Sequence, residues 1–196
     1  MLFNKFSKKY FLSEDFLFFS LKGISSFIKL IFLLIIPLIF INDGQYLLFG
    51  IIFPILTSIT IISGVGYPVT LVKDYTNKLI DEKEYHSTLF PLHSISILLL
   101  SLAVIFTVNG LKIWHLIPIL LFNTSEVIII DYLRLKQADS NLKKHVTISL
   151  YKSLFNFLFI LFIYLFSVRI EFIHLIFCFS IINFLLIFKI NYRGFI

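Results

Sequence analysis

Four charged side chains inside long apolar runs are the residues of this chain best suited to binding chemistry. Lys22 and Lys29 lie in one run near the N-terminus, and Glu126 and Lys152 lie in two later runs. An ammonium group that is shielded from water binds anions strongly, and a carboxylate beside it forms an ion pair or exchanges a proton. We therefore expect substrate binding at Lys22, Lys29 and Lys152, and ion coupling or a structural ion pair at Glu126.

The composition defines the setting of these charges. Of the 196 residues, 59% are hydrophobic, 14% are charged and 25 are phenylalanine. A water-soluble domain has about a quarter charged residues and is close to half apolar. No soluble core has room for so much apolar surface, so the composition predicts an integral membrane protein.

The apolar runs predict six membrane spans. A helix needs roughly 20 mainly apolar residues to cross a hydrocarbon core about 30 Å thick. The ten-residue alternation typical of a β-barrel strand is absent from the sequence. We expect an all-α integral membrane protein, a bundle of six transmembrane helices in a single domain over residues 1–196. The expected spans lie near 16–41, 47–72, 88–108, 113–131, 147–167 and 172–190.

The basic residues between the spans predict the orientation. Twelve lysines and arginines flank one side of the expected bundle, whereas only Lys112 and Arg169 fall on the other. The positive-inside rule then predicts a multi-pass protein of the cytoplasmic membrane with both termini in the cytoplasm. Scattered between spans in this way, the basic residues do not favour nucleic-acid binding. The twelve residues are Lys5, Lys8, Lys9, Lys73, Lys78, Lys83, Arg134, Lys136, Lys143, Lys144, Lys189 and Arg193.

The two lysines of the first span are expected at different depths in the membrane. Lys22 is expected near the inner hydrocarbon boundary, where an alternative role is to extend its ammonium group to the lipid phosphates. Lys29 follows seven residues later, which is about 10 Å deeper on nearly the same face of a helix. Near the midplane a lysine needs a partner or a wet cavity, because a charge there costs about 2.5–3.5 kcal/mol on insertion scales.

Glu126 and Lys152 are expected to pair with each other. Glu126 precedes Asp131 by five residues, about 7 Å inside the expected boundary, and Lys152 has a similar depth at the start of the next span. The alternative to a transport role is a structural clamp within the bundle. With this pair formed, Lys29 keeps its charge, and three embedded lysines against one glutamate suit an anionic guest.

Enzyme chemistry is not indicated. The five histidines are scattered, and His86 and His93 have no acids at metal-ligand spacing. Asp81, Glu82 and Glu84 read as a solvated loop face. We expect no catalytic residue, no metal and no cofactor.

Two stretches resemble a known family of membrane transporters. The stretch "NDGQYLLFGIIFPILTSITIISGVGYPVTLVKDY" (42–75) has an acidic turn at Asp43, then Tyr46, a Gly66-Tyr67-Pro68 step and Lys73. The stretch "IIIDYLRLKQADSNLKKHVTISLYKSLFNFLFI" (128–160) has a span, a basic loop and a further span. Together they resemble the polysaccharide flippases, O-antigen type, of the multidrug/oligosaccharidyl-lipid/polysaccharide exporter superfamily.

The resemblance implies a substrate. Such flippases move an oligosaccharide carried on a polyprenyl pyrophosphate to the outer leaflet for surface polysaccharide synthesis, through a basic central cavity. Lys22, Lys29 and Lys152 would contact the pyrophosphate, and Glu126 would be the candidate for ion coupling.

The span number departs from that family, whose members have about twelve or fourteen spans in two halves. This chain corresponds to the N-terminal half. We expect a homo-oligomer or a second six-helix half, since polar residues such as Asn156 would otherwise meet lipid. A non-transporting membrane subunit or scaffold, or an inactive half of a longer flippase, is the alternative function.

Overall fold

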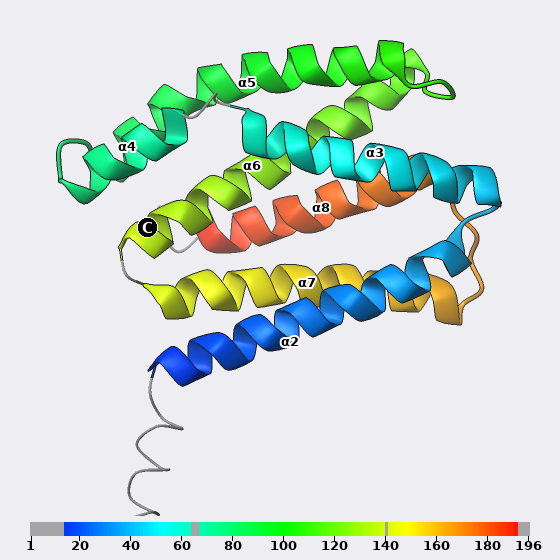
Figure 1. Cartoon of the computed structure of the whole chain (residues 1–196), viewed down its shortest axis with the longest axis horizontal. Helices are drawn as coiled ribbons and strands as arrows, with labels where there is room; N and C mark the ends of the chain where they lie inside the picture. The colour runs from blue at the N-terminus through cyan, green and yellow to red at the C-terminus, as the bar shows by residue number, and fades with distance from the viewer. Residues whose placement is uncertain (1–13, 64–66, 140, 192–196) are drawn as a thin grey trace, which may run out of the picture.

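The computed structural model describes residues 14–63, 67–139 and 141–191, and within these ranges the chain is helical (Figure 1). Between the helices there is only an isolated bridge, Phe40 with Ile170. The elements are α2 (Glu14–Ile35), the 3-10 turn η1 (Ile36–Ile39), α3 (Asp43–Ile62), α4 (Tyr67–Thr76), α5 (Glu82–Thr107), the 3-10 turn η2 (Ile113–His115), α6 (Leu116–Ala138), α7 (Leu142–Leu165) and α8 (Phe172–Asn191).

Six helical segments of the described chain are long and apolar enough to cross a membrane, as the sequence predicted. Large apolar side chains point outward from them; Phe106 is 78% exposed and Phe188 is 71% exposed. In water such a surface would be costly, whereas hydrocarbon solvates it. The segments are Phe19–Ile39, Asp43–Ile62, Glu82–Thr107, Ile113–Ala138, Lys143–Leu165 and Phe172–Lys189.

The second expected span, 47–72, differs most from the structure. α3 begins at Asp43 because the Asn42 side chain caps it, accepting a hydrogen bond from the Gln45 amide at 3.0 Å. It ends at Ile62, and Tyr67 starts the separate ten-residue α4. Gly66 of the Gly-Tyr-Pro step lies outside the described residues, as do Lys5, Lys8, Lys9 and Arg193.

The third and fourth spans are longer than expected because their polar ends remain helical. Asp81 caps α5 by accepting a hydrogen bond from the Glu84 amide at 2.7 Å, so the helix begins well before residue 88. α6 continues past residue 131 to Ala138, where Lys136 lies 3.2 Å from Glu82 and 3.3 Å from Asp139. The stretches 73–87 and 132–146, between the expected spans, are therefore mostly helix.

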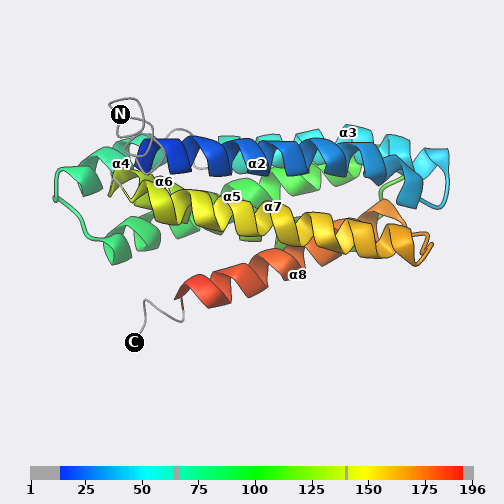
Figure 2. The same cartoon turned by 90° about the horizontal axis from the view of Figure 1, so that it is seen from below.

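The six membrane-spanning segments run roughly alongside one another, so the chain enters and leaves at the same end of the bundle (Figure 2). We call this end, which carries α4 and the connection between α6 and α7, the basic end. The opposite end carries the connections around residues 40–42, 108–112 and 166–171. α2 packs along α7, whereas α3 packs against α6, α5 and α8. α2 and α3 meet at the opposite end and diverge toward the basic end (Figure 1).

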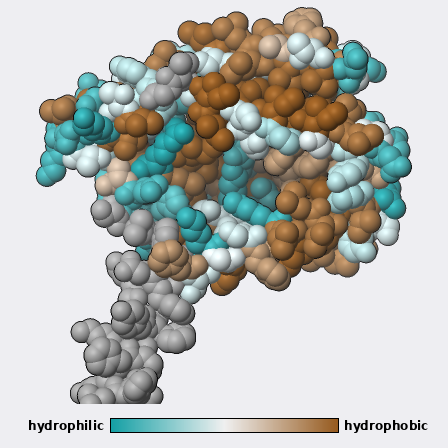
Figure 3. All heavy atoms as spheres, viewed as in Figure 1, coloured by the Kyte–Doolittle hydropathy of each residue, from teal (hydrophilic) through white to brown (hydrophobic). Residues whose placement is uncertain are grey.

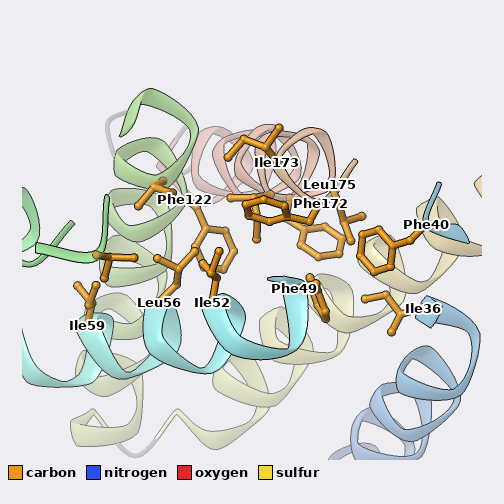
Figure 4. Close-up of a cluster of buried hydrophobic side chains, with 14 of the residues drawn as sticks. Ile36, Phe40, Phe49, Ile52, Leu56, Ile59, Phe122, Phe172, Ile173 and Leu175 are labelled. Atoms are coloured by element: carbon orange, nitrogen blue, oxygen red, sulfur yellow. The ribbon is translucent and has the colours of Figure 1, made fainter. Parts of the chain in front are cut away.

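An apolar core extends from the opposite end along α3 as far as Ile59 (Figure 4). Phe40 and Phe49 are 3% and 4% exposed, their ring centroids lie 5.4 Å apart, and Phe172 joins the same cluster. The backbone ties the segments together, since Ile170 donates to the Ile39 carbonyl at 3.0 Å and Ile41 donates to the Ile170 carbonyl at 3.2 Å. This packing holds the first turn of α3 against the start of α8.

Candidate functional site

Glu126 is the centre of a polar cluster that joins three helices. Its Oε2 accepts from Lys152 Nζ of α7, and its Oε1 accepts from Asn183 Nδ2 of α8 at 2.9 Å. Asn183 also donates to Ser125 Oγ at 3.2 Å. The expected ion pair is therefore present, and both carboxylate oxygens have partners. The pair is only partly shielded, with 12% of the Glu126 side chain and 22% of the Lys152 side chain exposed.

The structure places this cluster deeper than the sequence did. Because α6 continues to Ala138, Glu126 lies near the middle of the segment Ile113–Ala138 rather than near one end. Lys29 is the central residue of the segment Phe19–Ile39, and Lys152 lies near the middle of Lys143–Leu165. All three charges thus lie near the middle of their apolar segments.

Lys29 faces the ion pair from α2. Its neighbour one turn earlier, Ser25, is buried against α7 and hydrogen-bonds Ser153 at 2.9 Å. Residues four apart lie on the same helix face, so Lys29 is on the side of α2 that meets α7. It lies within electrostatic range of Lys152 and Glu126, yet no ion pair among the described residues includes it. The side chain is exposed in the isolated chain. It therefore adds one positive charge beside a pair that is already neutral.

Lys22 is separate from this group. It lies seven residues before Lys29, about 10 Å closer to the basic end. It lies within electrostatic range of His145 on α7. Its position fits the alternative role at the membrane boundary better than a place beside Glu126.

The face that carries α2 and α3 is hollowed in its middle, and hydrophilic side chains gather there between apolar surfaces (Figure 3). We call this hollow the central recess. α2 and α3 diverge on the same face (Figure 1). Asn156, one turn beyond Lys152 on α7, has a buried Oδ1 that accepts no hydrogen bond from the described residues. Such an acceptor needs water or a guest with a hydroxyl or amide donor.

A second buried cluster was missed by the sequence analysis. His93 of α5 lies with its Nε2 2.9 Å from Asp131 Oδ2 of α6 and its Nδ1 3.0 Å from Ser63 Oγ at the end of α3. Arg134 binds the other oxygen of Asp131 at 2.8 Å. Only 6% of the His93 side chain and 5% of the Asp131 side chain are exposed. His93 and Asp131 are 38 residues apart in sequence, and neither lies in a recognisable motif.

The two clusters differ in the chemistry open to them. Lys29 is exposed and 22% of the Lys152 side chain is exposed, whereas the side chains of His93 and Asp131 are almost completely buried. The Ser63–His93–Asp131 order resembles a nucleophile, base and carboxylate, but Ser63 is only 1% exposed, which leaves no room for a substrate at its hydroxyl. Among the described residues no three His, Cys, Asp or Glu side chains form a group able to hold a metal ion.

Comparison of this chain with protein-family models, with curated proteins and with solved structures finds no match. What the chain does must therefore be argued from its own geometry.

Proposed function

We propose that this chain is the membrane part of a transporter for a lipid-linked anion. The observation that carries the proposal is Lys29, which lies within electrostatic range of the Lys152–Glu126 pair, at the centre of the apolar segment Phe19–Ile39, and in no ion pair among the described residues. A lysine at that depth is costly unless a partner or a wet cavity compensates for it. An anionic head group that enters between α2 and α3 would supply the missing charge.

The direction of opening supports this proposal. α2 and α3 meet at the opposite end, where Phe40 and Phe49 are buried, and they diverge toward the basic end (Figure 1). By the positive-inside rule the basic end faces the cytoplasm, which would place both termini there. The recess would then receive its guest from the cytoplasmic leaflet, with the lipid chain remaining in hydrocarbon between the two helices.

The guest that we propose is an oligosaccharide on a polyprenyl pyrophosphate, moved across the cytoplasmic membrane for surface polysaccharide synthesis. A pyrophosphate is a strong acceptor for ammonium groups, and a sugar hydroxyl can donate to an acceptor such as Asn156 Oδ1. The resemblance of residues 42–75 and 128–160 to polysaccharide flippases supports the same class of guest. A second copy of the chain or a second six-helix half would cover the recess on its open side.

A non-transporting membrane subunit or scaffold is the competing function, and one observation favours it. Both oxygens of Glu126 are already bound by Lys152 and Asn183, so this cluster is complete without a guest. Under that function the cluster holds α6, α7 and α8 together, and Lys29 has no binding role.

Translocation in liposomes separates the two functions. The protein is reconstituted with a fluorescent polyprenyl pyrophosphate, and the fraction that stays protected from an external quencher is followed over time. We expect the wild type and the control Lys83→Ala, at an exposed position of α5, to speed exchange between leaflets. Lys29→Ala should slow it at least tenfold. Equal rates for Lys29→Ala and the wild type, or no acceleration by the wild type, would favour the scaffold.

A further inference from the structure

We propose that His93 is a proton-binding site whose occupancy is transmitted to the last turn of α3 through the hydroxyl of Ser63. The proposal does not depend on the identity of the transported guest. It rests on the hydrogen-bond geometry of the sealed cluster formed by Ser63, His93, Asp131 and Arg134.

The Ser63 hydroxyl has one hydrogen and two acceptors within reach. Its Oγ lies 3.1 Å from the Thr60 carbonyl and 3.0 Å from His93 Nδ1. When His93 is neutral with its hydrogen on Nε2, that N–H lies beside the Asp131 carboxylate, 2.9 Å from Oδ2, and Nδ1 must accept from Ser63. The hydroxyl hydrogen then points away from Thr60.

Protonation of His93 reverses this arrangement. Both ring nitrogens then carry hydrogen, so Nδ1 donates to Ser63 Oγ, while Nε2 keeps its hydrogen beside the Asp131 carboxylate. The Ser63 hydroxyl turns its hydrogen to the Thr60 carbonyl, one turn earlier on α3. A single proton at His93 thus adds a hydrogen bond within the C-terminal turn of α3, the helix that forms one side of the central recess.

The charged groups around His93 and Asp131 are compatible with both the neutral and the protonated form of His93. Arg134 is the cationic partner of Asp131 on α6. From α5, Tyr85 and His86 lie within electrostatic range of Asp131. Glu82 and Lys136 lie within electrostatic range of His86. From α4, the Tyr75 ring meets Tyr85 at 6.5 Å, with Lys73 and Asp74 next to it in sequence. One arginine, one carboxylate and a neutral histidine sum to zero, and the added proton leaves a single positive charge near these partners.

A small cavity gives the proton a route. It measures about 70 Å³ and is lined by His86, His93, Ser94, Thr124 and Asp131 among others. That volume is enough for about two water molecules at roughly 30 Å³ each. His86 is two helical turns nearer the basic end than His93, about 10 Å along α5, and it is half-buried. Water in the cavity would link the outer histidine to the sealed one.

The test follows the histidine rings directly. The full chain, labelled with ¹⁵N in its histidine rings and held in lipid nanodiscs, is studied by NMR as the pH is lowered from about 8 to about 5, the range in which histidine ordinarily changes charge. His93→Gln identifies the His93 signals, and His174→Gln, which removes a histidine that is 68% exposed, serves as the control. We expect the His93 signals to move from the neutral to the doubly protonated pattern, and Asp131→Asn to alter that movement. Constant His93 signals, or signals that move identically in Asp131→Asn, would overturn the proposal.

Hydrogen exchange tests the transmission to α3 and covers the case in which Asp131→Asn does not fold. In the wild type we expect the amides of residues 60–63 to exchange more slowly, relative to their intrinsic rates, at the lower pH. Ser63→Ala removes the hydroxyl without leaving a buried charge, and it should abolish that difference while the His93 signals still move. A difference that persists in Ser63→Ala would show that the hydroxyl does not carry the effect.

Discussion

Two carboxylates on α6, Glu126 and Asp131, show how one helix serves two kinds of site. They are five residues apart, which turns them about 140° from each other around the helix. Glu126 faces α7 and α8, where its partner Lys152 is 22% exposed, and Asp131 faces α5, where its partner His93 is 6% exposed. A pair near an opening can meet a large ligand, whereas a sealed pair can exchange only a proton. The difference in access, rather than in charge, therefore separates the proposed guest site from the proposed proton site.

Removal of Glu126 should have the largest effect on stability. Glu126→Ala leaves Lys152 without its anion and Asn183 without an acceptor, and breaking a shielded pair in this way costs about 3 kcal/mol. The free energy of unfolding in mixed micelles measures the loss. Glu126→Gln combined with Lys152→Gln removes both charges and should recover a large part of it. A double variant as unstable as the sum of its single variants would show that the two residues are not coupled.

Asp131→Asn should rank second, with a loss of about 2 kcal/mol in the free energy of unfolding. The change keeps the shape of the side chain but removes the anion that Arg134 and His93 share, and hydrogen bonds to charged groups are worth about 1.5–3 kcal/mol. Arg134→Gln is the matched control and should cost less, because 30% of the Arg134 side chain reaches solvent. If both variants cost the same, the sealed side of Asp131 contributes nothing extra.

Tyr75 at the basic end offers a smaller and pH-dependent test. Its hydroxyl donates to Asp139 Oδ1 at 2.8 Å, so Tyr75→Phe should cost about 1 kcal/mol near neutral pH. Burial raises the pKa of Tyr75 above its ordinary value, and the hydrogen bond to Asp139 raises it further. The neutral phenol is favoured in the folded chain, so this contribution persists below about pH 10 and is lost as the pH rises through the folded pKa. The Tyr75→Phe variant should therefore lose less stability than the wild type in that alkaline range, and a parallel loss would contradict this account.

Lys29→Ala should have the smallest effect on stability, within about 0.5 kcal/mol. The side chain is exposed in the isolated chain and belongs to no ion pair among the described residues. Lys152→Ala, in contrast, leaves Glu126 without its cationic partner and should be clearly destabilising. Equal losses for the two lysine variants, measured by the same unfolding titration, would place Lys29 in the structural clamp.

Hydropathy alone was enough to predict six apolar helices, because membrane-spanning length is a property of continuous sequence. The end of the second span was placed wrongly, since apolar residues continue beyond Ile62 into α4. The polar ends of α5 and α6 fell outside the expected spans because hydropathy does not register the Asp81 cap or the contact of Lys136 with Glu82.

The candidate site was predictable only where charge was conspicuous. Glu126 and Lys152 stood out as embedded charges of opposite sign, and the structure joins them. His93 was overlooked because a single histidine in a sequence does not indicate its partners, which come from the C-terminus of α3 and from the second half of α6. Asn183 was not predicted for the same reason, although it donates the second hydrogen bond to the Glu126 carboxylate.

Binding of a lipid anion to the purified protein is the most direct test of the central claim, that Lys29 offers a free positive charge at the recess. Nanodisc-held protein is titrated with a polyprenyl pyrophosphate and, in parallel, with the uncharged polyprenol of the same chain length, and bound lipid is counted by native mass spectrometry. We expect the wild type and Lys83→Ala to bind the pyrophosphate at least tenfold more tightly than the polyprenol, and Lys29→Ala to lose that preference. Equal binding of the two lipids by the wild type, or a preference that survives in Lys29→Ala, would contradict the account.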